Sequence, residues 1–109
     1  MSREPRAESD SELKPPAAER FFLFLYVTGA TPGSCRAVAS LKSFCEEHLK
    51  GRYALEVIDI YRQPDLAEED QVLATPTLIR KRPLPRRRLV GDLSDEERLL
   101  AGLGVLAPA

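Results

Sequence analysis

Leu73-Ala74-Thr75-Pro76-Thr77-Leu78 is the stretch of sequence that decides the fold. A proline lies between two threonines and leads directly into Thr77-Leu78-Ile79. Because proline donates no backbone hydrogen bond, it belongs at the first residue of a strand or at a sheet edge. It also drives the residue before it into extended geometry, which ends any helix that comes from Leu66. An X-Pro bond can be cis at a cost of about 0.5–1 kcal/mol. The stretch therefore predicts a strand opened by Pro76, which is a candidate cis-proline.

The sequence before this stretch predicts a β-α-β unit. Phe21–Val27 is apolar on both faces, as a central parallel strand should be. Thr31 is placed as an N-cap with Pro32 at the first helical position, and an amphipathic helix then runs to Gly51. The segment from Tyr53 to Ile60 is the second strand, so the connection is expected to be right-handed.

The sequence after the unit predicts shorter elements. Gln63-Pro64-Asp65 starts an acidic helix that is expected to include Leu66, Val72 and Leu73. Thr77–Arg82 and Arg87–Val90 predict a hairpin, with its turn at Pro83-Leu84-Pro85.

A capping box from Ser94 to Glu97 predicts the start of the last helix. The buried residues expected on that helix are Leu99, Leu100, Leu103 and Leu106. The predicted order is β-α-β-α-β-β-α, in a single α/β domain that resembles the thioredoxin-like fold.

Composition limits the class of protein. The chain has 109 residues, of which 43% are apolar and 30% charged, and its net charge is −1. We expect a disordered tail over residues 1–19 and one globular domain over residues 20–109. The longest apolar run, Phe21–Val27, is far shorter than the roughly 20 residues that span a bilayer. Two unpaired cysteines favour a reducing compartment, so the sequence predicts a soluble, cytoplasmic protein without membrane partners.

The thiols and the single histidine are weak candidates for chemistry. Cys35 occupies the second position of a C-x-x-C pattern, but Pro32 stands at the attacking first position. Cys45 is ten residues further along one helix, about 15 Å away, which exceeds the disulfide limit of about 7 Å between Cα atoms. His48 is expected to be structural, because no second set of metal ligands and no catalytic motif accompany it. The residues thus predict no catalytic site, no metal and no cofactor, although a degenerate redox protein that uses Cys35 alone remains an alternative.

A run of basic residues defines the hairpin. Six of the nine residues from Arg80 to Arg88 are basic. An acidic surface of a protein partner suits them best, because arginine makes bidentate contacts with carboxylates. A solvated sheet edge is the second interpretation. Nucleic acid comes third, since no aromatic residues are interleaved and the whole chain is not basic. The acidic run Glu68-Glu69-Asp70 is interpreted as a solvated helix face.

Several motifs resemble the KaiB family of bacterial circadian clocks. They are Leu25-Tyr26-Val27-Thr28-Gly29, Thr31-Pro32, Tyr53 to Asp59, Pro64, Leu66 to Asp70, Leu73 to Leu78 and Gly91-Asp92-Leu93-Ser94. The resemblance implies a non-enzymatic adaptor that binds the ATPase ring of a hexameric KaiC-like protein. It also implies a link to a KaiA-like protein or a histidine kinase pathway, and a capacity to form homo-oligomers. Pro83-Leu84-Pro85 departs from the three consecutive prolines of many members, so a stress or signalling pathway remains open beside a clock.

The resemblance also implies particular residues. Arg36, Arg62, Arg87 and Arg88 correspond to basic residues that support KaiC binding in the family. KaiB proteins adopt two folds, a thioredoxin-like form and a self-associating form with a rearranged C-terminal half. We therefore expect residues from about Gln63 onward to rearrange slowly, with hinges at Pro76, Pro83 and Pro85.

Overall fold

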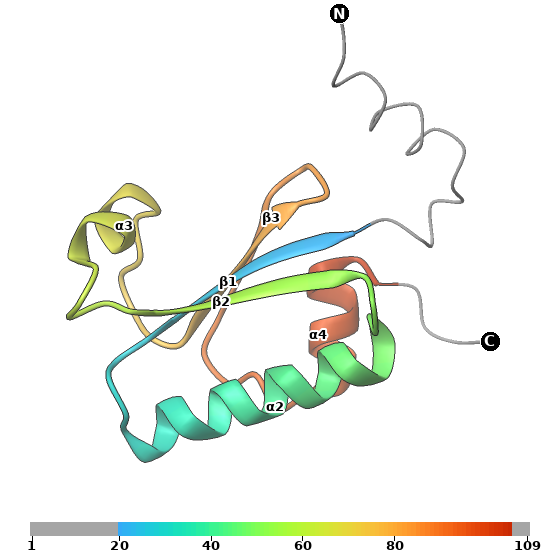
Figure 1. The fold of residues 1–109 in the computed structure, drawn as a ribbon, viewed down its shortest axis with the longest axis horizontal. Coiled ribbons are helices and arrows are strands. Elements are labelled where there is room, and N and C mark those ends of the chain that lie inside the picture. Colours follow the sequence, from blue (N-terminus) through green and yellow to red (C-terminus); the bar gives the residue numbers. More distant parts are fainter. Residues whose placement is uncertain (1–19, 106–109) are drawn as a thin grey trace, which may run out of the picture.

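The computed structural model describes residues 20–105, which form one four-stranded sheet with three helices (Figure 1). The elements are β1 Phe21–Val27, α2 Pro32–His48, β2 Tyr53–Asp59, α3 Pro64–Glu69, β3 Thr77–Arg82, β4 Arg87–Val90 and α4 Glu96–Leu103. The α/β class and the predicted order of elements are confirmed. The expected tail over residues 1–19, and Leu106, lie outside the described residues. Among the helices described, none is long and apolar enough to cross a bilayer.

Strand β1 lies in the interior of the sheet and contributes side chains to the hydrophobic clusters on both faces. The sheet order is β2-β1-β3-β4, with β1 parallel to β2 and antiparallel to β3. Successive side chains of a strand point to opposite faces, so Leu23 and Leu25 pack in a core with α2 and α4, whereas Tyr26 packs in a second cluster with Ala67 of α3. The apolar character of both faces of β1 follows from this double cover.

The start of α2 is as the sequence predicts. Thr31 is the N-cap, its side chain accepts a hydrogen bond from the backbone N–H of Ser34, and Pro32 opens the helix. The helix ends at His48, and Gly51 takes a positive φ of 76° on the way into β2.

The three candidate prolines all follow cis peptide bonds, namely Thr75-Pro76, Arg82-Pro83 and Leu84-Pro85. Pro76 stands immediately before β3, and its carbonyl accepts a hydrogen bond from the N–H of Gly91 at 3.0 Å. The β3–β4 hairpin has the predicted bounds.

The predicted extent of α3 is wrong, because the helix ends at Glu69 and leaves Val72 and Leu73 outside. Gln71 adopts a left-handed φ of 55°. Its N–H bonds the carbonyl of Glu68, and the N–H of Val72 bonds that of Ala67. This pair of bonds is a Schellman motif, which stops a helix by satisfying its last carbonyls. Leu73 is 96% exposed as a result.

The predicted capping box at Ser94 is also wrong. Asp95 is the N-cap of α4, and its carboxylate accepts hydrogen bonds from the N–H groups of Glu97 and Arg98. The Ser94 hydroxyl instead donates to the carboxylate of Asp92 at 2.7 Å. Asp92 therefore accepts the hydrogen bond of the Ser94 hydroxyl, and Asp95 caps the helix.

Candidate functional site

The basic hairpin is anchored to α3 by one buried carboxylate. Asp70, only 7% exposed, accepts hydrogen bonds from the Tyr26 hydroxyl at 2.5 Å, from Lys81 at 2.8 and 2.9 Å, and from Arg86 at 2.8 Å. Arg88 donates to the backbone carbonyl of Asp70 at 2.5 Å. We call these five residues the Asp70 network. The interpretation of Asp70 as part of a solvated helix face is thus wrong. Its buried carboxylate pairs with Lys81 of β3 and with Arg86 of the β3–β4 turn.

The Asp70 network shifts the pKa values of its two acids in opposite directions. Burial by itself would raise the pKa of Asp70, but hydrogen bonds from Lys81, Tyr26 and Arg86 outweigh burial and hold that pKa below its usual value. Burial, followed by the hydrogen bond to Asp70, raises the pKa of Tyr26 well above the ordinary value. Asp70 is therefore held as a carboxylate and Tyr26 as a neutral donor.

Arg80 is turned into the protein rather than toward a partner. It is 5% exposed, and its guanidinium donates to the carbonyl of Leu103 at 2.6 Å and to that of Pro85 at 2.5 Å. A cation at the last carbonyls of α4 also complements the negative end of the helix dipole. The interpretation of the hairpin as a solvated sheet edge is therefore wrong at Arg80.

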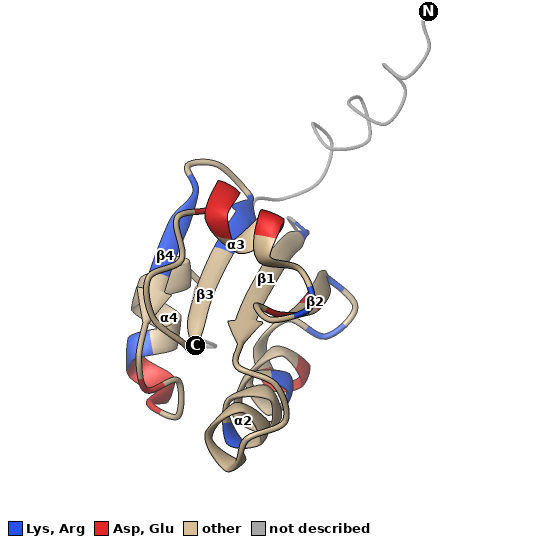
Figure 2. Cartoon of the chain, turned by 90° about the vertical axis from the view of Figure 1, so that its left-hand side faces the viewer, with Lys and Arg blue, Asp and Glu red and all other residues tan. Residues whose placement is uncertain are grey.

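Two exposed arginines of the hairpin lie on β4, whose ribbon runs beside the acidic α3 (Figure 2). Arg87 and Arg88 are exposed there and line a shallow hollow of about 260 Å³ together with Glu69 and Gln71. Arg88 also donates to the carbonyl of Gln71 at 3.2 Å. These two candidate residues are brought together by the structure.

The other two candidate arginines lie elsewhere on the surface. Arg36 is exposed on the first turns of α2 and lines a separate groove of about 610 Å³ with Gly33, Pro76 and Asp92. Arg62 is exposed in the turn between β2 and α3 and lines neither hollow.

The two cysteines differ in accessibility. Cys35 is exposed in the first turn of α2, whereas Cys45 is fully buried and has its pKa raised to about 12, first by burial and then by the charge of Glu46. A thiol with so high a pKa is not a nucleophile near neutral pH. Of the two, only Cys35 is available for chemistry.

Sequence reasoning missed Asp70 and Tyr26 as paired residues. They are 44 positions apart. The available signal was the single hydroxyl on an otherwise apolar strand, because a buried tyrosine usually needs a hydrogen-bond partner for its O–H.

Comparisons with known proteins agree with the architecture. The sequence pattern of the KaiB domain family matches residues 24–105. The circadian clock oscillator protein KaiB of Prochlorococcus marinus is 54% identical over 90 residues, which cover 83% of this chain and 84% of that protein. The corresponding protein of Synechococcus elongatus is 55% identical over 86 residues, which cover 79% and 84% of the two chains.

Solved structures show the same fold. The N-terminal domain of Synechococcus elongatus SasA superposes with a TM-score of 0.66 and 30% identity, covering 84% of this chain and 91% of that domain. Chloroplastic thioredoxin z superposes with a TM-score of 0.64 at 18% identity, covering 95% and 88% of the two chains, and shows the fold alone. The domain match and the identity over most of both chains show that this chain belongs to the KaiB family.

Proposed function

We propose that this chain is a non-enzymatic adaptor of the cytoplasm that binds the ATPase ring of a hexameric KaiC-like protein. Its identity of 54% over 90 residues with a circadian clock oscillator protein carries the proposal. Binding would regulate a circadian or stress-signalling system. We also expect a link to a KaiA-like protein or a histidine kinase pathway, and we expect the chain to form homo-oligomers.

The exposed arginines support an interface with an acidic protein surface. Arg87 projects from the surface of β4, and Arg36 from that of α2. Since a lost partner in a buried interfacial charge pair costs about 2–5 kcal/mol, reversing the charge at a contacting arginine should weaken binding strongly.

Surface plasmon resonance with the KaiC-like ATPase of the same genome tests the proposal. We expect Arg87→Glu to weaken binding at least tenfold, and a quadruple reversal that adds Arg36, Arg62 and Arg88 to abolish it. Lys42→Glu is the matched control, because Lys42 is an exposed cation of α2 outside the candidate set. Equal affinity of the parent and the quadruple variant would show that the interface lies elsewhere.

A redox protein that uses Cys35 alone is the second candidate, because this thiol is exposed in the first turn of α2. The adaptor proposal expects Cys35→Ser to bind the ATPase as the parent does, and expects the parent to reduce no insulin disulfides. Reductase activity in the parent that disappears in Cys35→Ser would favour the redox function instead.

A further inference from the structure

Three metal-ligating side chains converge where α2 ends and α4 begins. The Nε2 atom of His48 lies 2.5 Å from Glu96 Oε2 and 4.0 Å from Glu47 Oε1. One ligand atom from each of the three residues lies within 4.8 Å of the other two. No part of the proposed adaptor function uses this cluster.

The histidine is held in place while the two glutamates are able to adjust. The His48 side chain is 4% exposed and its ring packs on Phe44, with the ring centroids 4.7 Å apart. The side chains of Glu47 and Glu96 are 65% and 53% exposed. A buried imidazole that faces two exposed carboxylates is an arrangement in which the carboxylates can close around an ion.

The buried ring also shows which atom is the ligand. Within the described part of the chain, His48 Nδ1 is buried and has no hydrogen-bond partner. His48 Nε2 is the ring nitrogen directed at the two carboxylates, and an imidazole nitrogen is a common metal ligand.

We propose that His48, Glu47 and Glu96 bind a divalent transition-metal ion, with Zn²⁺ as the representative ion. Mixed imidazole and carboxylate donors suit zinc, copper and nickel, whereas magnesium and calcium prefer oxygen ligands alone. In a tetrahedral zinc site the metal–ligand distances are about 2.0–2.2 Å, so neighbouring ligand atoms lie about 3.3 Å apart. The 2.5 Å and 4.0 Å separations bracket this value, and we expect rotation of the two exposed glutamates to bring both toward it.

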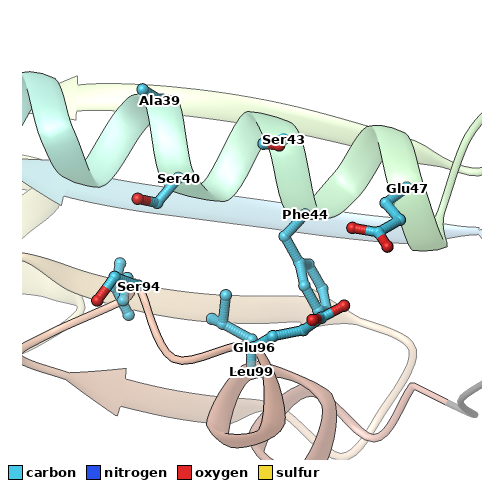
Figure 3. A pocket seen from close by; sticks show the side chains of 9 residues that line it. Ala39, Ser40, Ser43, Phe44, Glu47, Ser94, Glu96 and Leu99 are labelled. Atoms are coloured by element: carbon cyan, nitrogen blue, oxygen red, sulfur yellow. The ribbon is translucent and has the colours of Figure 1, made fainter.

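The surroundings leave room for a fourth ligand. Glu47 and Glu96 line a cavity of about 370 Å³ between α2 and α4 (Figure 3). In Figure 3 the Glu96 side chain extends from α4 toward the end of α2, where Glu47 lies. Water from this open side completes the coordination. Because Nδ1 lacks the acceptor that usually tightens a histidine–metal bond, we expect binding about 10–100-fold weaker than at a site that has this partner.

The ion would join two elements that are far apart in the sequence. His48 and Glu96 are 48 positions apart, in the last turn of α2 and the first turn of α4. Binding to the folded chain alone stabilises it by mass action. The site would thus make the packing of α4 on α2 dependent on metal concentration.

Nuclear magnetic resonance tests the proposal directly, because the chain contains a single histidine. ZnCl₂ is added to the untagged 109-residue chain while the ¹⁵N resonances of the imidazole are followed. We expect the Nε2 resonance to shift at a 1:1 stoichiometry. An unmoved Nε2 resonance at saturating zinc would overturn the proposal.

Calorimetric titration with ZnCl₂ then identifies the ligands. We expect His48→Gln and Glu96→Gln each to weaken zinc binding at least tenfold. Glu97→Gln is the control and should bind zinc as the parent does, because Glu97 is the exposed neighbour of Glu96 on α4. Cys35→Ser excludes binding by the exposed thiol and should also retain the parent affinity. If His48→Gln does not fold, Glu96→Gln carries the test, since its side chain is exposed. Unchanged affinity in Glu96→Gln, or its loss in Cys35→Ser, would overturn the proposal.

Discussion

At the scale of single residues, the carboxylate of Asp70 forms ion pairs with two cations, Lys81 and Arg86. It is buried and accepts hydrogen bonds from Tyr26, Lys81 and Arg86. Lys81 also lies over the ring of Phe24, with its Nζ atom 4.7 Å from the ring centroid. The amine of Lys81 is thus fixed between a carboxylate and an aromatic face.

Replacing Asp70 by asparagine tests the strength of this network. Asp70→Asn keeps the size of the side chain but removes the charge that faces Lys81 and Arg86. Because Arg86 is half-exposed and water screens it, we expect a loss of only about 1–3 kcal/mol in the free energy of unfolding at pH 7. Urea denaturation measures the loss. Glu69→Gln, an exposed neighbour, is the control and should change stability little.

The same substitution should change how stability depends on pH. The pKa of Asp70 is lowered in the folded chain, so its stabilising contribution is fully present above the unfolded value of about 3.9. That contribution is lost as the pH falls through the lower folded pKa. The stability difference between parent and Asp70→Asn should therefore shrink below about pH 4. An equal difference at pH 7 and pH 3 would contradict the assignment.

The residue scale is where prediction from the sequence is weakest. Acidic and basic runs are exposed by default, and nothing local distinguishes Asp70 from Glu69 or Arg80 from Arg82. Burial of Asp70 and Arg80 depends on partners 44 and 23 positions away in the sequence, which only the tertiary fold supplies. Among the candidate arginines, the exposure of Arg36 and Arg87 is expected from their positions in local elements.

At the scale of elements, the packing of α4 on β4 depends on one glycine. A Cβ atom added at Gly102 would lie 2.5 Å from Cδ2 and 2.8 Å from Cγ of Leu89. Alanine is better than glycine in a helix by about 1 kcal/mol, but crowding of a packed core costs typically about 1–3 kcal/mol. The close approach of the helix and the strand therefore favours glycine here.

We expect Gly102→Ala to destabilise the parent and to stabilise a Leu89→Ala variant. In the variant the crowding is gone, and the helix propensity of alanine remains as a gain of roughly 0.5–1 kcal/mol. A double-mutant cycle by urea denaturation measures both effects. If Gly102→Ala has the same sign in both backgrounds, Leu89 is not the residue that it crowds.

Elements were predictable where their signals are strictly local. Pro76 and the apolar run of Phe21–Val27 place two strands correctly, because a missing donor and an unbroken apolar face leave few alternatives. The end of α3 and the cap of α4 were not predictable in this way. The end of α3 depends on the left-handed φ of Gln71, and at the start of α4 both Ser94 and Asp95 are residue types that can cap a helix.

At the scale of the whole molecule, a few side-chain contacts reinforce the β1–β3 pairing that joins the β-α-β unit to the rest of the chain. Tyr26 reaches Asp70, and His48 reaches Glu96. The first half contains strands of 7 residues and a helix of 17, whereas α3, β4 and α4 have 6, 4 and 8 residues. Short elements contribute little stability of their own. That the chain from about Gln63 onward can rearrange stays a prediction. The contacts of Tyr26 with Asp70 and of His48 with Glu96 would oppose such a rearrangement.

Tyr26→Phe should raise the population of any second arrangement of that half. The substitution keeps the buried ring but removes the hydroxyl that donates to Asp70. Leaving this buried acceptor with one fewer donor costs about 1–3 kcal/mol, and every 1.4 kcal/mol is tenfold in an equilibrium constant. We expect two sets of amide resonances in the variant, with the doubled peaks confined to residues after about Gln63. Leu55→Val, a conservative change on the other face of the sheet, is the control for general destabilisation. Doubling that extends through β1 and α2 would mean that the two halves rearrange together. A single set of peaks in a destabilised Tyr26→Phe would mean that they do not rearrange at all.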